Sequence, residues 1–274
     1  MHTVNANGAA IPAIGFGTWD LPGDRVQHLV EHAIGLGYRH VDTAQMYKNE
    51  APVGAGIKSS GIARDEIFLT TKIWPDDFRS DAFRRATDER LKLLGVDQVD
   101  LLLLHWPSKT VPLAETIEAL NAAREAGHTR HIGVSNFTTA MIDEAARLSA
   151  APLVTNQVEY HPFLSQTKVL ATLARHGMAL TAYCPIARGK VVGDPILTEI
   201  GKAHGKSATQ VALRWLVQQD GVIAIPRSSN EERIAENLNC VDFQLSDAEM
   251  ARINAMGSPK GRVVDIAIAP EWDD

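Results

Sequence analysis

Polar side chains close most of the short apolar segments in this sequence. Asp, Lys and His can transfer protons or stabilise charge, while hydroxyl and amide groups can hold a ligand by hydrogen bonds. If the apolar segments are strands of one sheet, their ends meet at a common face and these groups converge on one site. Seven of eight such segments end in this way, at Asp42, Lys72, His105, Ser135–Asn136, Gln157, Tyr183 and Arg227–Ser228.

The segments that must position these groups alternate with stretches of helical period. The expected strands are 14–17, 40–42, 68–71, 100–105, 132–135, 155–159, 180–183 and 222–225. Helical patterns occupy 24–36, 50–60, 81–94, 113–126, 139–148, 167–176, 195–218 as two helices, 231–237 and 247–256. The last of these follows Ser246, a residue that favours the N-cap position.

Eight strands with intervening helices predict an α/β fold of the (β/α)₈ TIM-barrel type. A doubly wound sheet shows the same local alternation and is the structural alternative. Asn7-Gly8 between two apolar stretches predicts an N-terminal β-hairpin ahead of the barrel. No linker rich in Pro, Gly or Ser interrupts the pattern, so we expect a single barrel domain over 1–274.

Composition excludes several classes of protein. The 274 residues carry a formal net charge of −6, which gives no overall attraction to nucleic acid or to anionic membranes. Cys184 and Cys240 are too few for a disulfide framework. No signal peptide is recognisable, and no apolar run approaches the ~18–20 residues that span a bilayer. We therefore expect a cytoplasmic protein with neither a nucleic-acid nor a membrane partner.

Three short motifs that could indicate metal, phosphate or dinucleotide binding are weak signals in this sequence. His28-Leu29-Val30-Glu31-His32 matches a zinc pattern, but on an outward-facing helix it predicts two surface histidines and no metal site. The phosphate-loop pattern needs a glycine where Ile200 stands and a preceding strand. No G-x-G-x-x-G follows any strand, so a Rossmann loop is not what would hold a dinucleotide here.

Six further motifs together resemble the aldo-keto reductase family. They are G-Y-R-H-V-D-T-A-Q-M-Y-K-N-E at 37–50, T-K-I-W at 71–74, L-L-H-W-P at 103–107, I-G-V-S-N-F at 132–137, N-Q-V-E-Y-H-P at 156–162 and I-P-R-S-S-N-E-E-R-I-A-E-N-L at 225–238. They follow the family order and spacing across nearly the whole chain. The family fold is the (β/α)₈ barrel, which agrees with the strand count.

The resemblance implies a catalytic tetrad of Asp42, Tyr47, Lys72 and His105. A carbonyl that accepts hydride becomes an alkoxide, so its oxygen needs a proton donor and hydrogen bonds. Tyr47 is the implied general acid, and a nearby Lys72 ammonium is expected to lower its pKa. Asp42 would hold Lys72 charged, and His105 would orient the carbonyl.

The resemblance also implies where NADPH, the expected cofactor, would bind. Ser135, Asn136 and Gln157 correspond to residues that bind the nicotinamide carboxamide, and Tyr183 to the residue that stacks on the ring. Cys184 and Ala187 depart from the common Y-S-P-L-G form, so the pyrophosphate contacts of those two positions are in doubt.

The adenine side of the implied cofactor site lies in the last motif. Arg227, Ser228 and Arg233 would bind the 2′-phosphate, with Glu236 and Asn237 at the adenine. Many relatives have lysine at position 227. Because arginine can contact a phosphate through two hydrogen bonds, we expect the site to favour NADPH over NADH.

Three tryptophans and the tail bear on substrate choice. Trp19, Trp74 and Trp106 match aromatic positions that wall the substrate pocket in relatives, and no metal is implied. The short C-terminal tail resembles that of bacterial members that reduce 2,5-diketo-D-gluconate and methylglyoxal. It predicts a pocket open at its rim and narrow near Tyr47, suited to small α-dicarbonyls.

The resulting hypothesis is NADPH-dependent reduction of small aldehydes and ketones by a monomer whose partner is a small-molecule carbonyl substrate. One alternative is an NADPH-binding regulatory subunit with little turnover. A second is another barrel enzyme, such as an aldolase or isomerase that uses Lys72. The complete tetrad favours turnover, and the adenine-side motif favours a dinucleotide.

Overall fold

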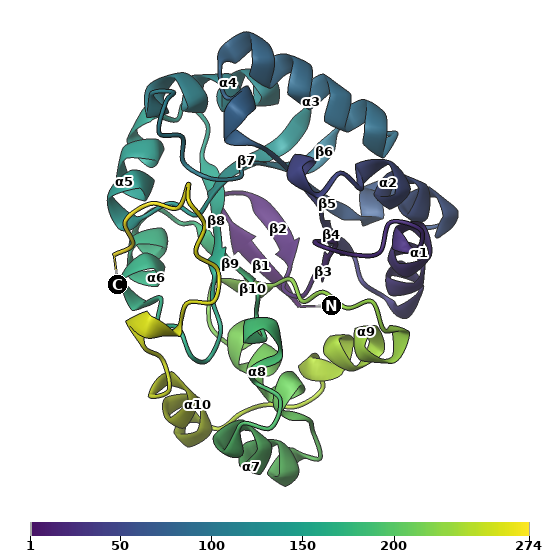
Figure 1. Cartoon of the computed structure of the whole chain (residues 1–274), viewed down its shortest axis with the longest axis vertical. Helices are drawn as coiled ribbons and strands as arrows, with labels where there is room; N and C mark the ends of the chain where they lie inside the picture. The colour runs from purple at the N-terminus through teal and green to yellow at the C-terminus, as the bar shows by residue number, and fades with distance from the viewer. Residues whose placement is uncertain (1, 274) are drawn as a thin grey trace.

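Among residues 2–273, eight parallel strands form one sheet in which every strand lies beside its neighbour in sequence. The computed structural model describes residues 2–273. The strands run in the order β10-β9-β8-β7-β6-β5-β4-β3 around the centre of Figure 1. Their bounds are β3 Phe16–Gly17, β4 His40–Asp42, β5 Phe68–Ile73, β6 Val99–Leu104, β7 Thr129–Ser135, β8 Leu153–Glu159, β9 Ala179–Tyr183 and β10 Val222–Ala224. This is the expected (β/α)₈ barrel, and the alternative of a doubly wound sheet is wrong.

The barrel closes where the first and last strands meet. Gly15 N donates to Ala224 O at 2.8 Å, and Gly17 N donates to Pro226 O at 3.0 Å. A Cβ on Gly17 would lie 2.9 Å from Ile225 O, so the closure requires glycine at this position. The contact brings the segment after β10 beside the segment after β3.

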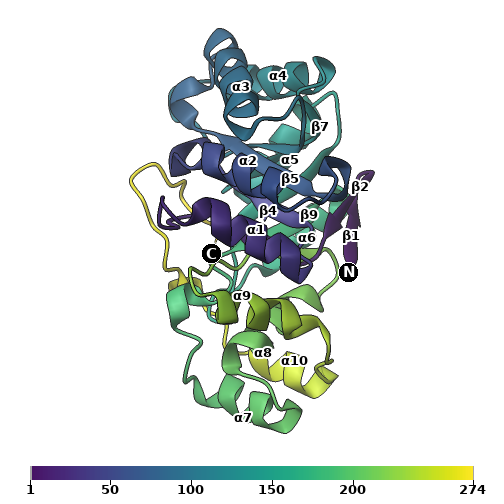
Figure 2. The ribbon, with the colours of Figure 1, turned by 90° about the vertical axis from the view of Figure 1, so that its right-hand side faces the viewer.

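In the described part of the chain, ten α-helices lie around the sheet (Figures 1 and 2). They are α1 Val26–Leu36, α2 Glu50–Ser59, α3 Ser80–Leu94, α4 Leu113–Glu125, α5 Thr139–Leu148, α6 Thr167–Arg175, α7 Pro195–His204, α8 Ala208–Val217, α9 Glu231–Leu238 and α10 Asp247–Asn254. Ser246 caps α10 as expected, in a capping box with Glu249. The expected bounds differ from the observed ones by no more than two residues at any helix end, since helix ends fray.

The N-terminal hairpin forms at the end of the barrel opposite the C-terminal tail (Figure 2). It pairs β1 Thr3–Ala6 with β2 Ala9–Pro12. Asn7 and Gly8, the two turn residues, have φ of 45° and 87°. Two positive φ angles define the turn that Asn-Gly favours between antiparallel strands, which explains why the sequence signal was reliable.

The strands are buried on both faces because helices cover the outside and side chains fill the inside. Every residue of β6 is buried, including its leucine run 101–104. β5 continues to Ile73, two residues beyond the expected end, so Lys72 lies within the strand and not after it. No helix among residues 2–273 is long and apolar enough to cross a membrane.

Candidate active site

Four side chains from the first half of the barrel meet at the carboxyl ends of the strands. Asp42 is the last residue of β4, Tyr47 ends the short 3₁₀ turn Gln45–Tyr47, Lys72 comes from β5, and His105 directly follows β6. Lys72 Nζ lies 2.6 Å from Asp42 Oδ1 and 3.2 Å from Tyr47 Oη. The ring centroids of Tyr47 and His105 are 5.7 Å apart. The expected tetrad is therefore a single cluster.

The Lys72 ammonium has all of its hydrogen-bonding capacity in use. Its third donor reaches Thr43 O at 2.8 Å, in addition to Asp42 and Tyr47. An ammonium has three N–H groups and no acceptor, so the Tyr47 oxygen must accept from Lys72. The phenolic proton of Tyr47 is consequently not used in this bond and remains available to another acceptor.

The Asp42 carboxylate is held at both oxygens. Oδ1 accepts from Lys72, and Oδ2 accepts from Gln157 Nε2 at 2.7 Å. Asp42 and Lys72 are 1% and 0% exposed, and a buried ion pair persists only when its remaining hydrogen-bonding groups are also satisfied. Gln157, expected at the nicotinamide, thus also connects β8 to the tetrad.

The pKa of Tyr47 differs from the sequence-based expectation. Burial raises the pKa of the phenol well above its ordinary value, and the nearby Asp42 carboxylate raises it further. The expected lowering of this pKa by Lys72 is therefore wrong, because burial, the largest cause, disfavours the charged phenolate. Burial likewise lowers the pKa of Lys72, while Asp42 opposes this shift. Tyr47 remains protonated at neutral pH.

His105 is a neutral imidazole in a buried aromatic setting. Burial lowers its pKa well below the ordinary value, and the Lys72 charge adds to the effect. Trp74 packs perpendicular to it, with ring centroids 5.2 Å apart. Its Nδ1 is buried without a hydrogen-bond partner among the described residues. The ring can therefore act as a hydrogen-bond group but not as a cationic acid.

The loop that carries Tyr47 is fixed to three neighbouring segments. Asn49 accepts from Thr43 Oγ1 at 3.0 Å and donates to Thr18 O at 2.9 Å. Gln45 accepts from Trp74 N at 2.7 Å. Glu50, at the start of α2, accepts from Thr71 Oγ1 at 2.6 Å. These contacts leave the phenol little freedom relative to Lys72.

The residues expected at the nicotinamide form their own network beside the tetrad. Tyr183 donates to Asn136 Oδ1 at 2.8 Å, and Asn136 Nδ2 donates to His105 O at 3.0 Å. Ser135 Oγ donates to Gln157 O at 2.8 Å. Asn136 adopts a left-handed conformation with φ of 64°, which asparagine tolerates better than most residues. The network orders these side chains before any ligand binds.

The three expected wall tryptophans take different places. Trp19 is 46% exposed and contacts the Tyr47 ring edge-on at 5.0 Å between centroids. Trp74 borders His105, as described above. Trp106 is buried and faces Trp272 of the tail, with centroids 6.2 Å apart. Trp19 and Trp74 thus border the tetrad directly, while Trp106 links it to the tail.

Several hydrogen bonds hold the C-terminal tail, the segment that follows α10, against the barrel. Glu159, the fully buried last residue of β8, accepts from Val263 N at 2.6 Å and from Val264 N at 2.8 Å. It also bonds His161 Nε2 at 2.8 Å. Farther along, Asp273 Oδ2 accepts from Thr139 N, the first amide of α5, at 2.6 Å.

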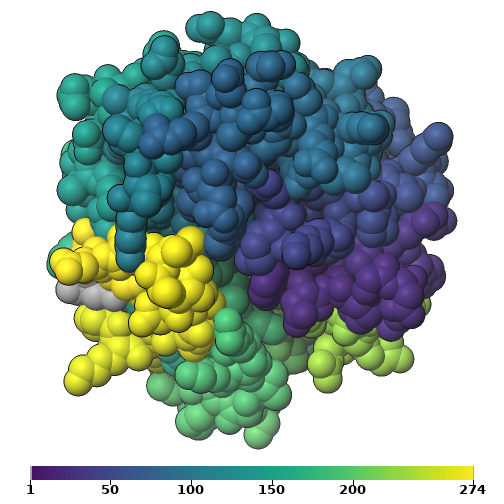
Figure 3. All heavy atoms as spheres, turned by 45° about the horizontal axis from the view of Figure 1, so that its top comes forward, coloured from purple at the N-terminus to yellow at the C-terminus, as the bar shows by residue number. Residues whose placement is uncertain are grey.

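The anchored tail forms one side of the barrel mouth, the end of the barrel at which the strands have their carboxyl ends. Figure 3 shows it in yellow against the teal and blue surface, across the face from the purple N-terminal segment. The expectation of an open rim therefore needs correction, because Trp272 adds a wall beside Trp106. The sequence held one signal for this role, a tryptophan among the acidic residues that end the chain.

The residues expected at the 2′-phosphate lie on the segment from Arg227 into α9. Arg227 is turned toward the segment after β3, where its guanidinium bonds Trp19 and Asp20. Ser228 Oγ bonds the backbone of Asn230, and Asn230 caps α9 by accepting from Arg233 N at 2.9 Å. No ion pair with any residue from 2 to 273 engages the exposed Arg233 guanidinium.

The two residues expected at the adenine lie farther along α9. Glu236 is exposed, and its carbonyl accepts from Gln210 Nε2 at 3.1 Å. Asn237 is buried, at 4% exposure. Both lie on the same short helix as Arg233, so the expected adenine side is contiguous and lies at the barrel seam.

The segment after β9 carries unusual backbone geometry where the sequence departs from the family form. Cys184, Ala187 and Arg188 have φ of 48°, 48° and 54°. Side chains with a Cβ rarely adopt such angles, so this segment is locally strained. Burial raises the pKa of the Cys184 thiol to about 11, so the thiol is protonated and unreactive at neutral pH.

The donor set at the mouth fits a dinucleotide with an extra phosphate. Asn136 and Gln157 present amides that match a carboxamide, and Tyr183 presents a flat ring at the end of β9. Arg227 and Arg233 place cations before and within the first turn of α9, on the side expected to hold the adenine. The first turn of α9 also carries Glu231 and Glu232, so the two arginines are the groups that would attract an anion there. The residues present therefore fit NADP(H) without a Rossmann loop.

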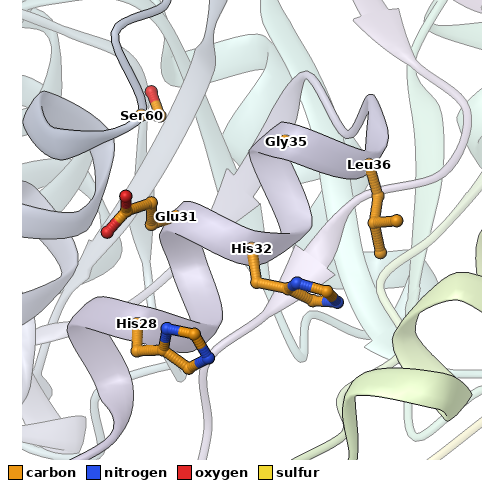
Figure 4. Close-up of a pocket in the computed structure, with 6 residues that line it drawn as sticks. All are labelled: His28, Glu31, His32, Gly35, Leu36 and Ser60. Atoms are coloured by element: carbon orange, nitrogen blue, oxygen red, sulfur yellow. The ribbon is translucent and has the colours of Figure 1, made fainter.

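The His28–His32 motif lies on α1, away from the tetrad. Figure 4 shows both imidazoles on one side of the helix, while Glu31 points away from them toward Ser60. The groove that they line has a volume of about 490 Å³. His28 Nε2 bonds Glu231 at 3.1 Å. Across the described part of the chain, no group of three or more His, Cys, Asp or Glu residues is arranged to hold a metal ion.

Comparison with known proteins agrees with the barrel. The sequence model of the aldo/keto reductase family matches residues 13–258, so the chain belongs to this family. It is an oxidoreductase of the NADP(H)-dependent kind that the family comprises.

Three known proteins illustrate the similarity. A crystal structure described as a putative 2,5-diketo-D-gluconic acid reductase B is 56% identical, with a TM-score of 0.99 over 100% of this chain and 98% of that one. Methylglyoxal reductase DkgB of Escherichia coli O157:H7 is 40% identical over 96% of this chain and 100% of its own. A Bombyx mori aldo-keto reductase in complex with NADP is 36% identical, with a TM-score of 0.90 over 97% and 95% of the two chains.

Proposed function

We propose that this protein reduces small α-dicarbonyl compounds to hydroxy-carbonyl products with NADPH, and that Tyr47 is the general acid. The observation that carries the proposal is that Lys72 Nζ makes three hydrogen bonds, one for each of its N–H groups. Its three N–H groups reach Asp42, Thr43 and Tyr47, so the phenol oxygen is an acceptor and its proton is directed elsewhere.

The bound cofactor supplies a hydride to the carbonyl carbon. In our proposal Tyr183 supports the nicotinamide ring, and Ser135, Asn136 and Gln157 bind its carboxamide. Their mutual hydrogen bonds keep these groups ordered, which lowers the entropic cost of binding. Gln157 also bonds Asp42 at 2.7 Å, so nicotinamide position and tetrad position are linked through one side chain.

The protein then supplies the proton. As the carbonyl oxygen gains negative charge, Tyr47 donates its proton and His105 donates a hydrogen bond. An alkoxide is a far stronger base than a phenolate, so transfer is favourable even though burial raises the pKa of Tyr47. The phenolate that remains is stabilised by Lys72 Nζ at 3.2 Å, and solvent restores its proton.

The proposed substrate class rests on the tryptophans that border the tetrad and on the substrates named in the descriptions of two relatives. Trp19 and Trp74 flank Tyr47 and His105 and narrow the site to a small reacting group. An adjacent carbonyl withdraws electrons and eases hydride attack, so α-dicarbonyls need the least assistance from the protein. Relatives described as a methylglyoxal reductase and a putative 2,5-diketo-D-gluconic acid reductase B support this class.

The test is a substrate panel with purified protein. NADPH consumption is followed with methylglyoxal, 2,5-diketo-D-gluconate, simple aldehydes, glucose and a steroid ketone. We expect the dicarbonyls to give the highest kcat/KM, with each factor of ten corresponding to about 1.4 kcal/mol of transition-state discrimination. A preference for glucose or the steroid would overturn the dicarbonyl assignment. NADPH binding without turnover of any carbonyl would overturn the reductase assignment.

A further inference from the structure

The segment after β3 forms a tight turn next to the cofactor-side arginine. Leu21 N donates to Thr18 O at 3.4 Å, so Trp19 and Asp20 are the two central turn residues. Asp20 has φ of 54°, a left-handed conformation that glycine, asparagine and aspartate adopt more readily than other residues. Asp20 is 75% exposed at its side chain, so no packing requirement explains an aspartate here.

Arg227 makes three hydrogen bonds to this turn. Its Nε donates to Trp19 O at 2.9 Å, and its Nη2 donates to Asp20 O at 2.5 Å. Nη2 also lies 2.9 Å from Asp20 Oδ2, which makes an ion pair. The barrel closure brings the two segments together, since Gly17 N bonds Pro226 O. The guanidinium therefore already has an anionic partner in this structure.

A 2′-phosphate that binds through Nη2 would compete with that partner, because Asp20 O and Asp20 Oδ2 already accept from Nη2. A carboxylate and a phosphate both bind the fork of N–H groups that arginine presents, and Nη2 cannot satisfy both fully. Asp20 would also repel a phosphate dianion placed beside it. An exposed ion pair is weak, so a phosphate that forms a two-hydrogen-bond contact can displace the carboxylate.

We propose that Asp20 is a specificity-determining residue that competes with the 2′-phosphate of NADPH for Arg227. Binding of NADPH breaks the Asp20–Arg227 ion pair, whereas NADH leaves it intact. Asp20 thereby reduces the preference for NADPH over NADH. This inference rests on the proposed function only in that it takes Arg227 to contact the 2′-phosphate.

The Asp20–Arg227 ion pair lies beside the proposed substrate pocket. Arg227 holds the carbonyl of Trp19, and the Trp19 ring contacts Tyr47 at 5.0 Å between centroids. The turn is attached to the barrel by Leu21, which is 7% exposed, and by Thr18 Oγ1, which donates to Asp42 O at 3.0 Å. The backbone of the turn is thus held independently of the Asp20 carboxylate, so removing the carboxylate charge should not displace Trp19.

The test is equilibrium binding of each cofactor to Asp20→Asn, measured by quenching of protein fluorescence. Asparagine keeps the size of the side chain and tolerates the left-handed backbone, so the variant should fold. We expect the Kd for NADPH to fall about three- to tenfold, as the loss of one exposed competing charge would give. The Kd for NADH should change less than twofold. Binding is measured without turnover, so the result does not depend on the reaction.

Two further variants complete the design. Asp24→Asn removes another exposed charge from the same loop, and no ion pair among residues 2–273 involves Asp24. It should leave both Kd values within twofold. In an Arg227→Ala background, Asp20→Asn should no longer strengthen NADPH binding, because there is no guanidinium to compete for.

Distinct outcomes separate failure of this inference from failure of the proposed function. Unchanged NADPH affinity in Asp20→Asn, an equal gain for both cofactors, or an equal gain in Asp24→Asn would overturn the role of Asp20 while leaving the reductase intact. Failure of the unaltered protein to bind NADPH at all would overturn both.

Discussion

The tetrad and the adenine side of the same mouth are organised in opposite ways. Asp42 and Lys72 are essentially unexposed, and their charged groups bond only to one another and to other parts of the site. Arg227 and Arg233 are partly or fully exposed, and Arg227 bonds a carboxylate that a ligand would replace. Buried charges must find partners within the chain, because the alternative is a large desolvation cost. Exposed charges can exchange partners at little cost.

This contrast predicts that changes at the tetrad alter chemistry with little effect on cofactor affinity, and that changes on the adenine side do the reverse. The first test is Tyr47→Phe, which removes the phenolic proton and keeps the ring against Trp19. We expect kcat to fall about 10²- to 10⁴-fold, the usual contribution of a general acid. Steady-state rates and an NADPH titration should show a Kd within twofold of the unaltered protein.

The matched control for this variant is Tyr160→Phe. Tyr160 donates to Gln219 at 2.8 Å outside the tetrad, so its hydroxyl can be removed without touching the reacting atoms. It should retain nearly full turnover. Turnover of Tyr47→Phe close to that of the control would remove Tyr47 from the mechanism.

The second test concerns Glu50, a buried carboxyl group at the start of α2, next to the loop that carries Tyr47. Glu50 is 2% exposed, and burial raises its pKa to about 7. Arg90 Nε lies 3.1 Å away but is not aligned for a hydrogen bond, so it offsets the burial incompletely. The folded-state pKa is above that of the unfolded chain, so Glu50 contributes most stability when protonated. That contribution is lost as the pH rises from about 4.5 through about 7.

Glu50→Gln mimics the protonated form and should remove this dependence. Between pH 5 and pH 8, the free energy of unfolding of the unaltered protein should fall relative to that of the variant by a few kcal/mol, at about 1.4 kcal/mol per pKa unit. Urea unfolding at both pH values measures it. Glu89→Gln, which changes the exposed partner of Arg90, serves as the control. Parallel pH profiles for Glu50→Gln and the unaltered protein would show that Arg90 compensates fully.

The third test lies on the adenine side. Arg227→Ala should raise the KM for NADPH about 10- to 150-fold, as expected for a lost charged hydrogen bond worth about 1.5–3 kcal/mol. The KM for NADH should rise less than threefold, and kcat with saturating NADPH should change little. Arg227→Lys keeps the charge and should recover part of the affinity. Equal effects on the two cofactors would show that Arg227 does not contact the 2′-phosphate.

The smallest effect should come from metal removal. We expect carbonyl reduction to lose less than about a tenth of its rate after exhaustive treatment with EDTA, because the proton and the hydrogen bonds come from Tyr47 and His105. Rates are measured before and after dialysis against the chelator. Loss of activity that zinc restores would bring back the interpretation of His28 and His32 as metal ligands.

The sequence by itself determined the alternation of strands and helices and the hairpin at Asn7-Gly8, and its resemblance to the family supplied the four expected tetrad residues. The alternation and the hairpin depend on residues that are close together in the sequence. Periodicity, turn chemistry and motif spacing act within a few residues, so they can be read without knowing what packs against what. The strand ends were also close enough to place Asp42, Lys72 and His105 at one face.

Only the tertiary structure decided how those residues are used. Burial raises the pKa of Tyr47 and the Asp42 carboxylate raises it further, and the extent of that burial is not visible in the spacing of the motifs. Glu159 fixes the tail from more than a hundred residues away, and Arg227 bonds Asp20 because the barrel closes between β3 and β10. Burial and long-range partners set the protonation and availability of a side chain, and they exist only once the chain has folded.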